Sequence, residues 1–193
     1  MYIYRCAKRG DFDKECIQTD VNTGDNSHIY EDGVEYIHFF KYAKDAEYFF
    51  RSSPQMIKGS EYHVGYTIAE VDENEISKFL GYGIYVIGPI FLEGDKNFYR
   101  PLLEYAIPKY LYDGFNKYFF KAKEKYAENV ESETYYDRIP DEFRNDSEYE
   151  EYLNVVNELR LKQSKNLNQC GKEMAHQIGN EILSSYEGYK RIK

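Results

Sequence analysis

The sequence has few of the residues that build disulfide-rich or zinc-binding proteins. Its three cysteines are Cys6, Cys16 and Cys170, and they form no Cys-x-x-Cys pair and no Cys/His pattern with metal-ligand spacing. Neither a disulfide framework nor a zinc site is therefore predicted. Thiols of this kind suit a reducing compartment, so we predict a cytoplasmic protein.

Long apolar runs are also absent. A membrane-spanning helix needs roughly 20 consecutive apolar residues, and every apolar run in this chain is far shorter. No signal-peptide pattern is present either. We therefore predict a soluble protein without a membrane partner, although an exported effector without a cleavable signal would have the same pattern.

Positive charge is in the minority. The chain has 25 Lys and Arg against 34 Asp and Glu, which gives a formal net charge of -9. This balance disfavours a general nucleic-acid-binding surface, because neutralising phosphates needs clustered Lys and Arg. Acidic residues are dense from residue 124 to 151. We interpret that segment as a solvated helix face and connector, with a surface for a basic partner as the alternative.

Tyrosine and phenylalanine are abundant, with 22 Tyr and 12 Phe but no Trp. Tyrosine buries its ring and keeps its hydroxyl hydrated, so it serves both cores and binding surfaces. The same bias is typical of chains from AT-rich genomes, so it does not mark a site by itself. Hydrophobic residues make up 42% of the chain, which predicts a packed core.

The hydrophobic pattern predicts an α+β protein in two parts. Short strands and one helix are predicted in residues 1–112, and helical spacing dominates residues 113–193. The predicted strands are 1–6, 35–40, 62–71, 82–90 and 102–107. The predicted helices are 44–52, 113–130, 148–162 and 168–186. We expect the second part to pack as a helical segment on the first.

One carboxylate interrupts a predicted strand. In "LLEYAI", Glu104 points away from the face that carries Leu103 and Tyr105, because side chains alternate along a strand. It therefore faces either water, as charged residues on edge strands do, or a cleft.

A histidine occupies a comparable place in an earlier strand. In "YIHFF", His38 shares one face with Tyr36 and Phe40. A histidine in this setting is either a ligand-binding residue or a hydrogen-bonded core residue. Arg5, in the first predicted strand, is likewise either a site residue or a surface residue.

These motifs together resemble the ADP-ribosyltransferase fold. The chain is similar to the small bacterial DNA-targeting ADP-ribosyltransferase toxins and their short uncharacterised relatives. "IYR" stands where the family has a first-strand His or Arg, "YIHFF" where it has its second-strand motif, and "LLEYAIP" where it has its catalytic Glu. "YGIYVIGPI" resembles a mid-sheet strand of the short relatives. The resemblance covers about residues 1–112 and implies a split β-sheet core.

The resemblance implies an NAD-dependent glycosyl transfer. Glu104 would stabilise the positive charge that develops on the ribose when nicotinamide leaves. Arg5 would contribute to catalysis and pair with the NAD phosphates, Tyr36 or Phe40 would stack on nicotinamide, and His38 would bind ribose or line the cleft. Leu102 stands where enzymes that modify protein arginine have a second acid, which argues against that specificity.

The implied protein is a toxin or effector whose acceptor is a nucleic acid or a protein. Two alternatives remain at the level of sequence. An acidic interaction or inhibitor protein, on an inactive version of the same fold, would bind a basic partner and no NAD. A protein that binds or processes another nucleotide would have the same fold with a different ligand.

Overall fold

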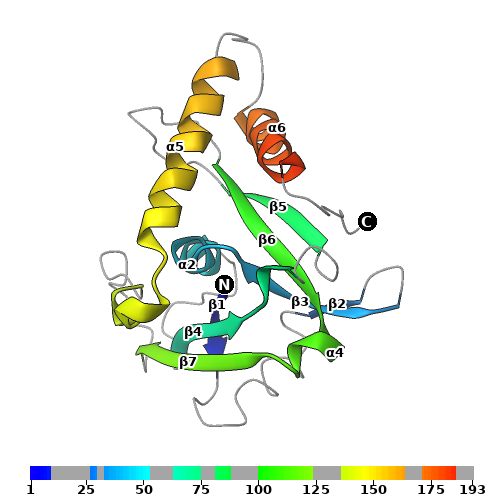
Figure 1. The fold of residues 1–193 in the computed structure, drawn as a ribbon, viewed down its shortest axis with the longest axis vertical. Helices are drawn as coiled ribbons and strands as arrows, with labels where there is room; N and C mark the ends of the chain where they lie inside the picture. Colours follow the sequence, from blue (N-terminus) through cyan, green and yellow to red (C-terminus); the bar gives the residue numbers. More distant parts are fainter. Residues whose placement is uncertain are drawn as a thin grey trace.

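A computed structural model describes residues 1–9, 27–29, 33–52, 63–74, 81–87, 100–123, 136–163 and 171–185. It confirms that the protein is α+β (Figure 1). The strands are β1 (Tyr2–Arg9), β2 (Ser27–Ile29), β3 (Glu35–Phe40), β4 (His63–Glu70), β5 (Gly81–Ile87), β6 (Arg100–Pro108) and β7 (Asn116–Lys123). The helices are α2 (Ala43–Ser52), α4 (Lys109–Tyr112), α5 (Asp146–Gln163) and α6 (Gly171–Ser184), with 3-10 turns η2 (Tyr136–Arg138) and η3 (Asp141–Phe143).

The strands form a seven-stranded sheet in which every pairing is antiparallel. The order is β5-β6-β3-β1-β4-β7, and β2 pairs with β3. The strands predicted near 1–6, 35–40, 62–71, 82–90 and 102–107 are confirmed as β1, β3, β4, β5 and β6. Strand β6, which carries Glu104, lies inside the sheet between β5 and β3.

The pairing between β1 and β3 is much shorter than the others. It consists of one residue pair, Tyr4 with Phe40, whereas β1 pairs with β4 along its whole length. Beyond that point β2 pairs with the other end of β3, from Glu35 to Ile37. We call the junction of β1 and β3 the seam, because it joins β5-β6-β3 to β1-β4-β7 through a single pair.

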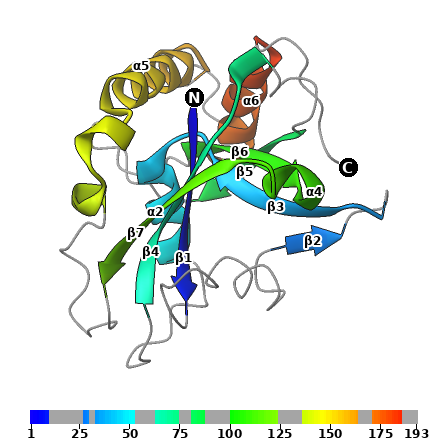
Figure 2. The same ribbon diagram turned by 60° about the horizontal axis from the view of Figure 1, so that its bottom comes forward.

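Helices α5 and α6 lie on one face of the sheet (Figure 2). That face carries a core cluster that the sheet shares with the two helices. It joins the strand residues Ile37, Phe39 and Tyr105 to helix residues such as Val156 and Ile178. Burial of these apolar side chains is the main term that holds the two helices on the sheet. The helices predicted at 148–162 and 168–186 are confirmed as α5 and α6 where the structure describes them.

The opposite face carries a second cluster shared with α2. It contains Tyr4, Phe40 and Leu102 from the strands and Ala46 and Phe50 from the helix. Because side chains alternate along a strand, Phe40 and Leu102 place His38 and Glu104 on this second face.

The predicted helix at 113–130 is wrong for residues 116–123, which form strand β7. Tyr118 and Phe120 pack on the second cluster, whereas the intervening Phe119 is 39% exposed. This alternation has the period of a strand. Pairing with β4 explains the outcome, since the ladder runs from Glu70–Asn116 to Val64–Lys123. The sheet thus extends past residue 112, where we predicted that its strands would end.

Among the described residues, no helix is both long enough and apolar enough to cross a bilayer.

Candidate functional site

His38 and Glu104 meet on the second face of the sheet. His38 Nδ1 lies 2.5 Å from Glu104 Oε1. The contact follows from the register: Phe40 pairs with Glu104 and His38 with Ala106, so the two side chains are diagonal neighbours on adjacent strands. The structure therefore brings together two residues that are 66 positions apart in the sequence.

Glu104 is buried, so the interpretation in which it faces water is wrong. Its exposed fraction is 4%, because β6 is flanked by β5 and β3 rather than lying at an edge. Burial raises the pKa of the Glu104 carboxyl above its ordinary value of 4.5. The hydrogen bond and charge of His38, and then the charge of Arg5, act in the opposite direction without cancelling it.

Arg5 lies at the seam. Its Nη1 donates a hydrogen bond of 3.4 Å to the backbone carbonyl of His38, and the residue is 6% exposed. The carbonyl lies between the part of β3 that pairs with β1, at Phe40, and the part that pairs with β2, ending at Ile37. The guanidinium thus gives this backbone carbonyl a side-chain hydrogen bond. The predicted role of Arg5 in binding phosphates stays a prediction.

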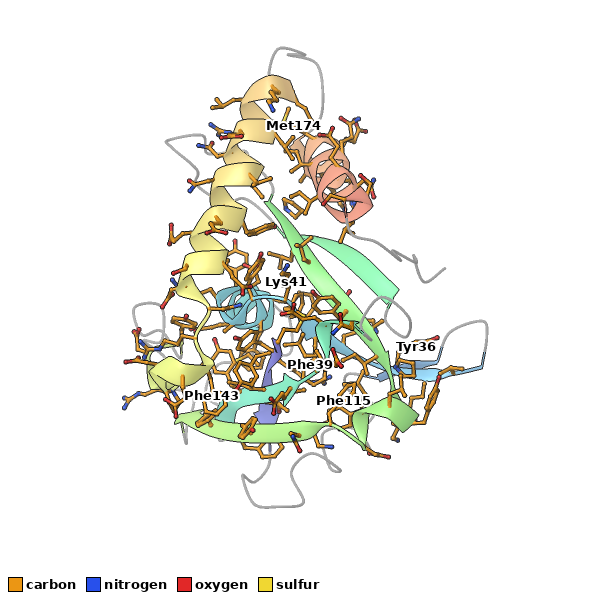
Figure 3. The ribbon with its side chains drawn as sticks, viewed as in Figure 1. Tyr36, Phe39, Lys41, Phe115, Phe143 and Met174 are labelled. Carbon is orange, nitrogen blue, oxygen red and sulfur yellow. The ribbon has the colours of Figure 1, made fainter. Side chains whose placement is uncertain are left out.

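The two aromatic residues predicted to bind the cofactor occupy different settings. Phe40 is 4% exposed and its ring centroid lies 5.0 Å from that of Phe49, so its ring belongs to the second cluster. Tyr36 is half-buried and pairs with Pro108, close to β2 and α4 (Figure 3). Their proposed stacking on a ligand stays a prediction.

Two glycines flank Glu104 on the other side. Gly83 pairs with Glu104 and Gly81 with Ala106. Glycine in a strand is typical of places where a ligand or another backbone comes close, because no side chain covers the main chain. The sequence alone did not show that these glycines lie beside Glu104. That information comes from the β5–β6 register.

Described residues also line two cavities near the start of α5, and the lining of the first includes residues of α2. One, of about 440 Å³, is lined by Lys44, Glu47, Tyr48, Tyr136, Asp137, Arg144 and Asp146. The other, of about 500 Å³, has five acidic residues in its lining: Glu73, Asp141, Glu142, Asp146 and Glu148. Neither cavity includes Arg5, His38 or Glu104 in its lining.

Buried Glu47 was not singled out by the sequence. Its Oε2 accepts hydrogen bonds from the Tyr66 hydroxyl at 2.9 Å and from the Tyr136 backbone N–H at 2.7 Å. These bonds tie α2 to β4 and to η2, which assigns Glu47 a structural role. Elsewhere in the described residues, no group of three or more His, Cys, Asp or Glu side chains is placed to hold a metal ion.

Comparison of the chain with protein-family models, with curated proteins and with solved structures gives no match.

Proposed function

We propose that the protein is an ADP-ribosyltransferase-like enzyme that cleaves NAD between nicotinamide and ribose and transfers ADP-ribose to a macromolecular acceptor. The observation that supports this most is the buried Glu104 carboxylate, held by His38 from the neighbouring strand. The seam also supports it, because the resemblance in the sequence implies a split sheet and β1 and β3 share a single residue pair.

The setting of Glu104 suits the chemistry. A carboxylate in a low-dielectric site stabilises a developing positive charge far better than one in water. Its backbone is fixed on both sides by the ladders to β3 and β5, so the carboxylate needs little reorganisation during the reaction. On β5, Gly83 pairs with Glu104 and Gly81 with Ala106, and glycine in a strand is typical of places where a ligand or another backbone comes close.

The nature of the acceptor follows in part from Leu102. This residue is 0% exposed and packs in the second cluster, so an acid at that position would be buried without a partner. The protein therefore lacks the second acid associated with modification of protein arginine. We propose a nucleic acid, or a protein side chain other than arginine, as the acceptor.

The proposal is tested by measuring nicotinamide release from NAD. We expect release by the wild type and a loss of at least roughly 100-fold in Glu104→Gln, since a preorganised electrostatic contact of this kind is typically worth that much. Glu70→Gln, which changes an exposed carboxylate on β4, is the control and should retain activity. Equal release by Glu104→Gln and the wild type would show that Glu104 is not the reacting carboxylate.

A second candidate is an acidic interaction protein. The observation that favours it is the cavity of about 500 Å³ whose lining contains five acidic residues. Such a protein would bind a basic partner in a salt-sensitive manner and would not bind NAD. Thermal shifts with NAD and with a panel of other nucleotides separate the candidates, because a ligand raises the unfolding midpoint only of a protein that binds it.

A further inference from the structure

We propose that His38 is the positioning residue of Glu104, and that it keeps the carboxylate oriented and ionised through a hydrogen bond donated by Nδ1. From the sequence, His38 was either a ligand-binding residue or a hydrogen-bonded core residue, and in the structure its Nδ1 is directed at Glu104. The effect of His38 on turnover rests on the proposed function, whereas its effect on the protonation of Glu104 does not.

The geometry of the pair makes this role specific. The two backbones are locked by five consecutive residue pairs between β3 and β6, so neither side chain has to be recruited from a loop. The side chains of His38 and Glu104 are 11% and 5% exposed, so water competes little for their hydrogen bond. A short bond between a nitrogen donor and a carboxylate in such a setting fixes both orientation and charge.

Arg5 in turn contacts the backbone of His38. Its guanidinium binds the carbonyl of His38 at the seam, and therefore fixes the backbone from which the imidazole projects. Arg5 is thus a positioning residue for His38, in addition to the favourable effect of its positive charge on the Glu104 carboxylate.

The charged groups that act on Glu104 come from two strands. They are His38 on β3 and Arg5 on β1, while the partner of Glu104 on β5 is Gly83. On α2, the Asp45 carboxylate accepts a hydrogen bond from the Tyr149 hydroxyl, and Glu47 is bound to Tyr66 and Tyr136.

Without His38, the positive charge of Arg5 would be the main factor that opposes the effect of burial on the pKa of Glu104. The pKa of Glu104, which burial already raises, should rise further when the hydrogen bond and charge of His38 are removed. Glu104 would then take up a proton at a higher pH and lose its ability to stabilise positive charge. The acid limb of any Glu104-dependent activity should move to higher pH in the same variants.

The test is a titration of the Glu104 carboxyl by carbon-13 NMR in glutamate-labelled protein, with Glu104→Gln used for assignment. We expect an upward shift of the apparent pKa in His38→Leu, and a smaller upward shift in His38→Asn, whose side-chain amide keeps a donor near the place of Nδ1. His176→Asn, which changes a half-buried histidine on α6, is the control and should leave the titration unchanged. An unchanged titration in His38→Leu would overturn the proposal.

The use of two variants keeps the experiment decisive if one of them does not fold. If His38→Leu fails to fold, as judged by circular dichroism, His38→Asn decides, and a titration identical to the wild type would overturn the proposal. If the titration shifts as expected but the wild type releases no nicotinamide, the positioning role stands and the proposed function fails. If the wild type releases nicotinamide, we expect His38→Leu to lower kcat by roughly 10- to 100-fold with little change in KM.

Discussion

Glu104 illustrates, at the scale of one residue, how a site can reduce stability. Its pKa is raised in the folded protein, so the folded state binds the proton more tightly than the unfolded chain. Stability therefore falls as the pH rises from the ordinary glutamate pKa through the folded-state pKa. At neutral pH the ionised carboxylate is a net cost that the rest of the fold offsets.

Replacing Glu104 by glutamine should remove that cost. We expect Glu104→Gln to raise the midpoint of thermal unfolding by a few degrees at neutral pH, and this gain should shrink as the pH falls towards 4.5, the ordinary pKa of the group. Differential scanning calorimetry across pH measures it. A midpoint that is lowered at neutral pH would mean that the ionised form of Glu104 stabilises the fold.

The sequence indicates the direction in which Glu104 points, but not whether that side of the sheet is buried. Alternation along "LLEYAI" showed that Glu104 points away from Leu103 and Tyr105, and this is a local property of any strand. Whether that face is wet or dry depends on what packs over it in the folded chain, where Glu104 is 4% exposed. The bond from His38 spans 66 positions, so no local pattern can predict it.

At the scale of one element, helix α5 has two neighbouring valines that should contribute very differently to the free energy of unfolding, because only one of them faces the core. Neighbouring Val155 and Val156 are 46% and 0% exposed. We expect Val156→Ala to lower the free energy of unfolding by about 2 kcal/mol, through lost burial and a cavity in the first cluster. Val155→Ala, the matched control, should change it by less than about 0.5 kcal/mol. Urea denaturation measures both, and equal effects would contradict this placement of the helix.

Strand β7 shows why an element can be predicted wrongly. Phe115, Tyr118, Phe119 and Ala122 recur at helical spacing, but the consecutive aromatic residues from 118 to 120 also suit a strand. When a short segment has both properties, its conformation is decided by the element that it pairs with or packs against. This segment pairs with β4, and its Tyr118 and Phe120 pack on the second cluster. Helices α5 and α6 were predicted correctly because their spacing persists over several turns.

At the scale of the whole molecule, sheet and helices share one core cluster. Ile178, Ile182 and Leu183 of α6 belong to the same cluster as Ile37 and Phe39 of β3. A chain that ends at residue 163 would leave this apolar surface exposed. We expect it to bind a hydrophobic dye and to unfold without the single sharp transition that we expect for residues 1–193, as followed by circular dichroism. A sharp transition with no dye binding would show that the sheet is stable without α6.

The seam has a consequence for the order of assembly during synthesis. The chain crosses between the two sides of the seam repeatedly, because β1, β4 and β7 lie on one side and β2, β3, β5 and β6 on the other. The β6 ladders close only after Pro108 has been made, and the β7 ladder only after Lys123. The surface that holds His38 and Glu104 therefore forms only after the residues up to Pro108 have left the ribosome.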